Sequence, residues 1–136
     1  ARPAAAVRRL DRLQGVEVHA DVPDLAAYLG TATVSIAPMK EGSGVPMKVL
    51  EAWAAGVPVV GHPWAADGLV EGAREAMIIA EEPGEWQEAL TGLLSDPVAA
   101  RRQADRGRSS WRDWYHPNRV ARLVREVVDQ AAGYRP

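Results

Sequence analysis

Hydrophobic residues follow two patterns along this chain. Short apolar runs recur at residues 34–37, 57–61 and 76–80, and such runs are typical of buried parallel strands. The longer segments between and after them place apolar residues three or four positions apart, as amphipathic helices do. Strands that alternate with helices at this spacing predict an α/β domain with a parallel sheet.

The same patterns place the individual elements. A fourth strand is expected at Val16–His19, where apolar and polar residues alternate after Gly15. Asp24 is expected to cap one helix, and Asp96 with Pro97 to start another. Helices are predicted at residues 4–13, 24–30, 46–55, 85–94, 96–111 and from 117 onward, and a loop with one helical turn at 63–72.

Residues 38–61, PMKEGSGVPMKVLEAWAAGVPVVG, organise the rest of the chain. Gly42 and Gly44 bracket Ser43 in a loop where the backbone can adopt a positive φ and approach a ligand closely. Pro46 fits the first position of the following helix, and Gly56 fits the position just past its end. The stretch therefore predicts a strand, a glycine loop, a helix of about three turns, and a second strand.

A helix that starts after a glycine loop, at the carboxyl end of a parallel strand, can bind an anion. Lys48 and Glu51 are three residues apart and share one face of this helix. A lysine near the helix start opposes the helix dipole, and a bound diphosphate would explain it. Glu51 could accept hydrogen bonds from sugar hydroxyls. The alternative is an ordinary loop with a solvated lysine–glutamate pair, and spacing alone leaves both open.

Parallel topology adds an expectation about the neighbouring loops. Loops that follow the strands of such a sheet lie together at one edge. The loops at residues 21–22, 39–45 and 62–68 should therefore converge on one crevice. His62 could reach that crevice, although a single histidine there is more often a hydrogen-bonded loop residue. No spacing of histidines and acids indicates a metal site.

The central stretch resembles the donor-binding segment of the retaining glycosyltransferases of family 4, also called group 1, which have the GT-B fold. Those chains read P, G-x-G, and then K-x-L-E-A-x-A-x-G-x-P-V-V. The resemblance continues from about Val16 to the end, through HADVPDLAAYLGTATVSIAP, DGLVEG and WRDWYHPNRVARLV. The matching residues of the central stretch are Pro38, Gly42, Gly44, Lys48, Leu50, Glu51, Ala52, Ala54, Gly56, Pro58, Val59 and Val60.

The resemblance implies roles for particular residues. Lys48 and Glu51 are the expected catalytic residues, with Lys48 as the counter-charge of the diphosphate and Glu51 at the ribose hydroxyls. Val22 is expected against the base. Many family members carry two glutamates eight positions apart. Glu51 matches the second, and this chain has Ser43 at the position of the first. The remaining residues expected to bind the donor are Gly42, Ser43, Gly44, Val45, Pro46 and Met47.

The resemblance also implies what the chain acts on and what it lacks. The substrate would be a nucleotide-diphosphate sugar, with an acceptor of unknown identity and neither a metal nor another cofactor. Residues 1–136 would form a single partial domain, the carboxy-terminal Rossmann-like half, truncated at its first two strands. The amino-terminal domain that binds the acceptor would be missing, so no transfer is expected from the chain alone. The strand at Val34 would then lie at an open edge, which a homodimer, a rearrangement or a shorter closed sheet could resolve.

Composition narrows the remaining classes. The formal net charge of −2 gives no basic excess for nucleic acid, and the absence of cysteine excludes disulfides and thiolate chemistry. No apolar run is long enough for a membrane span. The absence of cysteine fits a reducing compartment, and abundant alanine, arginine and valine without phenylalanine suggest a GC-rich bacterial genome, so a bacterial cytoplasmic protein is expected. An alternative location is the inner face of the membrane, which the arginine-rich helix predicted at residues 96–111 could contact. Two other functions stay open: a degenerate nucleotide-binding or protein-interaction module, and a sugar-nucleotide epimerase of the GT-B fold.

Overall fold

A parallel three-stranded sheet forms the centre of the chain. The computed structural model describes residues 3–42 and 44–133. Its strands β1 (Ser35–Ala37), β2 (Val59–Gly61) and β3 (Ile78–Ile79) lie in the order β1-β2-β3. Ile36 is aligned with Val60 in the first pair of strands. The predicted α/β class with a parallel sheet is therefore confirmed, in a Rossmann-like arrangement.

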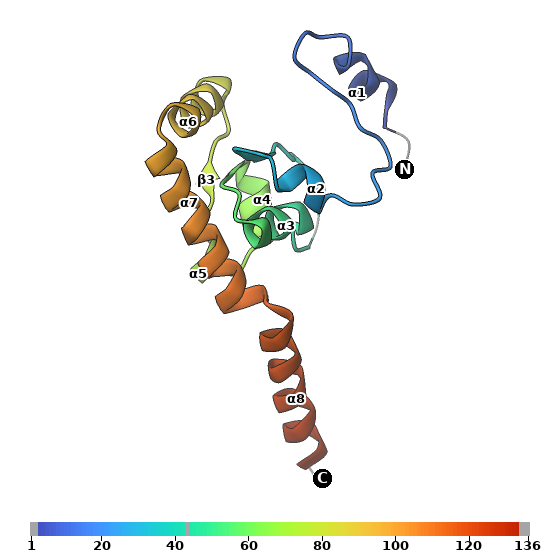
Figure 1. Cartoon of the computed structure of the whole chain (residues 1–136). Helices are drawn as coiled ribbons and strands as arrows, with labels where there is room; N and C mark the ends of the chain where they lie inside the picture. The colour runs from blue at the N-terminus through green and yellow to red at the C-terminus, as the bar shows by residue number, and fades with distance from the viewer. Residues whose placement is uncertain (1–2, 43, 134–136) are drawn as a thin grey trace.

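Helices surround this sheet and extend beyond it (Figure 1). The helix at 46–55 follows β1, as predicted, and two short helices separate β2 from β3. The helices of the described chain are α1 (Ala5–Leu10), α2 (Ala26–Leu29), α3 (Met47–Ala55), α4 (Pro63–Asp67), α5 (Glu71–Arg74), α6 (Pro83–Ser95), α7 (Pro97–Ser110) and α8 (Pro117–Gly133), with a π-helical turn, η1 (Trp111–Tyr115), between the last two.

The middle strand is buried on both of its faces, because successive side chains of a strand point to opposite sides. Val59 belongs to a cluster built with residues of α3, α4 and α5. Val60 belongs to a second cluster, in which Leu93 of α6 and Ala80 take part. Neither valine has any exposed surface. Helices therefore cover both faces of the sheet, which explains why β2 reads as an unbroken apolar run.

The predicted strand at Val16–His19 is wrong: this segment forms no strand in the structure. The N–H of Val18 donates to the side chain of Asp11 at 2.8 Å instead of to a neighbouring strand. Val16 remains 39% exposed. An alternating sequence forms a strand only where a sheet edge is available to pair with it, and this segment lies beside α1 and away from the sheet (Figure 1).

Other boundaries also differ from the predicted ones. Residues 63–72 hold the whole of α4 and the start of α5 rather than one helical turn. The helix at 96–111 ends as α7 at Ser110 and passes into η1. Asp96 caps α7 as expected, accepting hydrogen bonds from Val98 and Ala99 at 2.9 and 3.0 Å. The prediction that Asp24 caps α2 is off by one position: Leu25 is the cap residue, and the Asp24 side chain, just before it, accepts the N–H of Ala26 at 2.8 Å.

The open sheet edge that we predicted is present among the described strands. β1 has a partner only on the β2 side. Its central residue, Ile36, shares the face of Val60 but is 50% exposed, since α6 does not cover it. The sheet therefore ends in a strand with a half-exposed apolar side chain.

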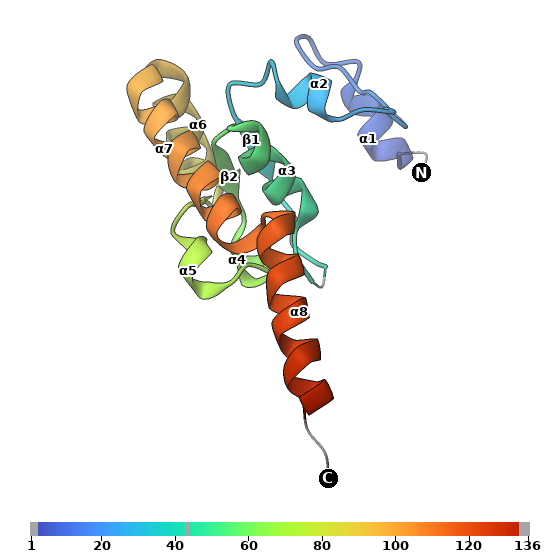
Figure 2. The same cartoon turned by 60° about the horizontal axis from the view of Figure 1, so that its bottom comes forward.

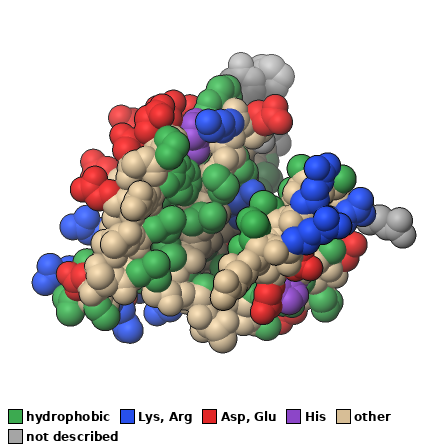
Figure 3. All heavy atoms as spheres, turned by 90° about the horizontal axis from the view of Figure 1, so that it is seen from above, with side chains coloured by type: hydrophobic (Ala, Val, Ile, Leu, Met, Phe, Trp, Pro, Cys, Tyr) green, Lys and Arg blue, Asp and Glu red, His purple; other side chains and the backbone are tan. Residues whose placement is uncertain are grey.

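Both ends of the described chain extend away from this body (Figure 2). None of the residues of α1 or α8 is buried. Seen from above, Lys and Arg side chains cluster over α1 at one side, and most of the visible hydrophobic side chains lie over the body of the molecule (Figure 3). Arg8, Arg9 and Arg12 line a hollow on α1. Among the described helices, none is long and apolar enough to cross a membrane.

Candidate functional site

The candidate site begins with the glycine loop between β1 and α3. Gly42 has a φ of 134° and Gly44 a φ of 88°. Both values lie in the region that side-chain-bearing residues rarely adopt, so the predicted need for glycine at these two positions is confirmed. Ser43, expected to bind the donor, lies outside the described residues.

Helix α3 starts one residue later than predicted. Pro46 is buried and has φ −76° and ψ 87°, so it is the cap and not the first helical residue. Its carbonyl accepts the N–H of Val49 at 2.9 Å, as the carbonyl of a cap residue does. The other end is as predicted: Gly56 adopts a left-handed conformation with φ 75° and ψ 37° and ends the helix.

The first turn of α3 has free hydrogen-bond donors. No side chain caps this helix, and no acidic residue lies in its first turn. The N–H groups of Met47 and Lys48 have no acceptor among the described residues. Unsatisfied donors at a helix start attract negative charge, and the helix dipole adds to this attraction. The start of α3 can therefore bind an anion.

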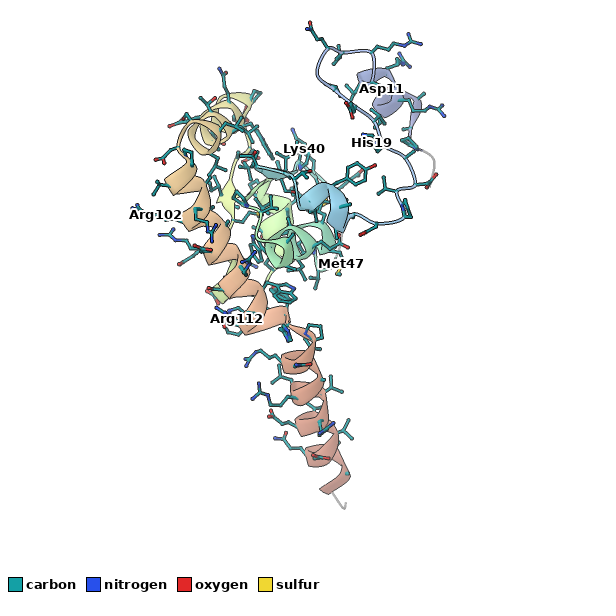
Figure 4. All side chains as sticks on the ribbon, in the orientation of Figure 1. Asp11, His19, Lys40, Met47, Arg102 and Arg112 are labelled. Atoms are coloured by element: carbon teal, nitrogen blue, oxygen red, sulfur yellow. The ribbon has the colours of Figure 1, made fainter. Side chains whose placement is uncertain are left out.

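Lys48 and Glu51 are both exposed and lie on the same side of α3. They form no ion pair with each other or with another residue of the described chain. The alternative explanation for their spacing, an ordinary lysine–glutamate pair on the helix surface, therefore does not apply among the described residues. An ammonium group and a carboxylate group remain available one helical turn apart. Figure 4 shows Met47 at the start of α3 and Lys40 on the preceding loop.

Glu51 lines a surface hollow of about 480 Å³ between α3 and the start of α2. Pro23, Asp24 and Leu25 form the opposite wall. Val22, which we expected against a base, is half-buried directly before this wall but does not line the hollow. The structure therefore brings Glu51 to the segment after Val22, and not to Val22 itself.

The loop after β2 meets the glycine loop, as predicted. Gly68 lies so close to it that a Cβ there would collide with the carbonyl oxygen of Gly44 and come within 2.9 Å of Cδ of Pro46. The loop at residues 21–22 behaves differently. Asp21 lines another hollow together with Arg8 of α1. Of the three loops predicted to converge, only the one at 62–68 meets the glycine loop; the loop at 21–22 does not, and only the residues after it reach the Glu51 side.

His62 has the structural role that was the more common alternative for it. It is 4% exposed, and its Nδ1 accepts the N–H of Trp64 at 3.3 Å, which caps α4. Its Nε2 lies 3.9 Å from a carboxylate oxygen of Glu81. No group of three or more histidine, aspartate or glutamate residues in the described chain could hold a metal ion.

Several residues of the hollow were not identified from the sequence. Leu25, Leu29 and Ala54 line it beside Glu51. The α3 side of the hollow could have been identified from the sequence, because Glu51 and Ala54 are three residues apart and share a helical face. The α2 side could not be identified, since it depends on how α2 packs against α3.

The comparisons with known proteins agree with this fold and loop. A family model described as glycosyl transferases group 1 matches residues 1–96. Neither the curated proteins nor the solved structures gave a match. The family match spans every strand, the glycine loop and α3, and it covers more than half of the chain. This chain therefore belongs to the group 1 glycosyltransferases.

Proposed function

We propose that this chain is the donor-binding part of a retaining, GT-B-fold glycosyltransferase of family 4. It would bind a nucleotide-diphosphate sugar of the hexose type for transfer to an acceptor. The observation that carries the proposal is the start of α3. Among the described residues, the N–H groups of Met47 and Lys48 have no acceptor and the Lys48 ammonium has no ion-pair partner, and two glycines with positive φ lie beside them.

The diphosphate would lie at this helix start. Backbone donors from Gly42 to Met47 would bind its oxygens, because a glycine loop lets the backbone approach closely. The ammonium of Lys48 would offset its negative charge. A lysine in the first turn costs helix stability when the site is empty, and an anion reverses that cost.

The nucleoside would extend from the diphosphate toward Glu51. A carboxylate accepts hydrogen bonds from two neighbouring hydroxyl groups, which suits a ribose. The hollow beside Glu51 has an apolar wall that includes Leu25 and Leu29, and its volume of about 480 Å³ is in the range of small-molecule sites. A base would fit against this wall, close to Val22.

Transfer breaks the bond between the sugar and the diphosphate, and negative charge then develops on the departing phosphate oxygen. The donors at the start of α3 and Lys48 would stabilise that charge, and preorganised stabilisation of this kind is often the largest catalytic contribution. The acceptor would bind to a further domain of a longer parent chain. The chain alone would therefore bind the donor in the cytoplasm without transferring its sugar, and the parent would cover the edge of β1.

Calorimetric titration tests the proposal. The chain and its parent would be titrated with UDP, GDP and ADP and with the matching nucleotide sugars. One diphosphate should bind, and Glu51→Ala and Lys48→Ala should each weaken that binding while leaving the thermal midpoint nearly unchanged. Glu88→Ala and Arg125→Ala serve as controls, because both side chains are exposed and lie on α6 and α8, outside the candidate donor site.

Each outcome decides between functions. Binding only in the parent would support donor binding that needs the missing strands. Equal loss of binding and stability in Glu51→Ala would reject the ribose role. Absence of nucleotide binding in both proteins would reject the proposal and favour an interaction module, and conversion of a nucleotide sugar without acceptor would favour an epimerase.

A further inference from the structure

A second charged site lies outside the family match, at the junction of η1 and α8. The π-helical turn ends at Tyr115, and Pro117 starts α8 in a new direction (Figure 2). A surface hollow of about 670 Å³ forms at this bend. None of its lining residues belongs to the glycine loop or to α3.

Three guanidinium groups line this hollow: those of Arg112, Arg119 and Arg122. Figure 4 shows Arg112 where α7 turns toward α8. Among the residues that line the hollow, one has a carboxylate. It belongs to Asp113, which lies 4.0 Å from Nε of Arg112 in an exposed pair, where solvent weakens the attraction. The hollow therefore carries a clear positive excess.

The two α8 arginines that line the hollow have no counter-charge among the described residues. Neither Arg119 nor Arg122 forms an ion pair with another residue of the described chain. The Nε of Arg119 is shielded from solvent and has no hydrogen-bond acceptor there. A shielded guanidinium donor without an acceptor is costly, so a bound acceptor would relieve it.

One of these guanidinium groups is already held in place. Arg119 lies over the ring of Trp114, with its Cζ 5.5 Å from the ring centre. This cation–π contact restricts the side chain before any ligand arrives, which lowers the entropy lost on binding. His116 is fixed as well, because its Nδ1 accepts the N–H of Asn118 at 3.2 Å.

We propose that this hollow binds a phosphoryl group. Planar guanidinium groups match the oxygens of a phosphate with paired hydrogen bonds, and several of them suit its double charge better than the single charge of a carboxylate. The phosphoryl group belongs either to a soluble phosphorylated molecule or to the headgroup of a lipid. The proposal does not depend on the nucleotide site at α3.

Titration of the whole chain with inorganic phosphate, at constant ionic strength, tests it. The Nε–H signals of Arg119 and Arg122 in nuclear magnetic resonance spectra report on this hollow and not on the α3 site. We expect both signals to shift as phosphate is added, and the two shifts to follow the same saturation curve. The double variant Arg119→Gln with Arg122→Gln should weaken this phosphate binding by about tenfold or more.

Arg125→Gln is the matched control, because Arg125 lies on the same helix and does not line the hollow. It should leave the affinity for phosphate within about twofold, since its exposed charge lies outside the hollow and solvent screens it. The conservative variant Arg122→Lys keeps the charge but loses the planar group, so it should retain only part of the phosphate binding of the unmodified chain. Circular dichroism checks that α8 stays helical in each variant.

Vesicles separate the two sources of the phosphoryl group. A lipid headgroup is identified if the chain is retained on phosphatidic acid vesicles but not on phosphatidylcholine vesicles. This retention should be lost in the double variant, and free phosphate should displace the chain from the vesicles. Phosphate binding without retention identifies a soluble molecule. Unshifted Nε–H signals together with no retention overturn the proposal, as does equal weakening by Arg125→Gln.

Discussion

Gly107 of α7 lies directly against the indole ring of Trp53 on α3. A Cβ at position 107 would collide with Cδ1 of that ring and come within 2.7 Å of its Nε1. Trp53 has no exposed surface and is the largest fully buried side chain in the described chain. The absence of a side chain at 107 therefore lets α7 pack closely on α3, the helix whose start forms the candidate donor site.

Gly107→Ala should destabilise the fold although alanine favours helices. The indole is enclosed and cannot move aside, so we expect a loss of about 1–3 kcal/mol in the free energy of unfolding. Gly92→Ala on α6 is the control, because a Cβ there meets nothing within 4 Å. It should stabilise the chain by about 0.5–1 kcal/mol. Urea denaturation measures both, and equal signs for the two variants would contradict this packing argument.

Asp96→Ala should remove the cap of α7. The aspartate accepts hydrogen bonds from Val98 and Ala99, and alanine leaves both donors without that partner. The expected loss is about 1 kcal/mol of unfolding free energy. Asp96→Asn, which retains a capping oxygen, should recover most of it. An unchanged midpoint for the alanine variant would show that solvent replaces the cap.

Tyr115→Phe should weaken the attachment of η1 to α5. The N–H of Val70 donates to the hydroxyl oxygen of Tyr115 at 2.7 Å, over 45 positions of sequence. Phenylalanine keeps the ring and removes the acceptor, so about 0.5–1.5 kcal/mol should be lost. Tyr28→Phe is the control, since the Tyr28 hydroxyl has no hydrogen bond in the described chain. Comparable losses in the two variants would argue against the η1 contact.

The start of α6 should make stability depend on pH in acid. Hydrogen bonds from the N–H groups of Glu81 and Glu82, at 2.7 and 3.1 Å, lower the pKa of Glu85 below its usual value. A lowered pKa in the folded chain means that the unfolded chain takes up the proton first. The stabilisation from Glu85 is therefore full above the unfolded pKa and disappears as pH falls through the folded one.

Denaturation curves measured across that acid range should show the difference. Glu85→Gln should flatten the fall in stability with decreasing pH, because glutamine does not titrate. Glu88→Gln, on the same helix but without a hydrogen bond to the cap, should leave the slope unchanged. A slope that both substitutions alter equally would indicate a general charge effect instead of the cap.

Elements with local signals were predicted well. The helix α3 could be placed within one residue because a glycine loop precedes it, Pro46 caps it and Gly56 ends it. The strands β1 and β2 were identifiable as apolar runs. Residues 16–19 were predicted wrongly because a strand also needs a neighbour, and no local pattern shows whether one is present.

The site was predictable only in part for the same reason. The need for glycine at 42 and 44 follows from local backbone geometry, and the structure has it. The failure of Lys48 and Glu51 to pair, and the hollow that Glu51 shares with Leu25, depend on side-chain placement and on the packing of α2 against α3. Tertiary contacts of this kind leave no periodic signal in a sequence.

Helix α8 has consequences for the kinetics of exchange with solvent. None of its residues is buried, and Val124, Val127 and Val128 of its apolar face are each more than half exposed. A helix of this length without tertiary support is only marginally stable in water. Its amide protons should therefore exchange through local opening, orders of magnitude faster than those of α3, whose exchange requires the sheet to open.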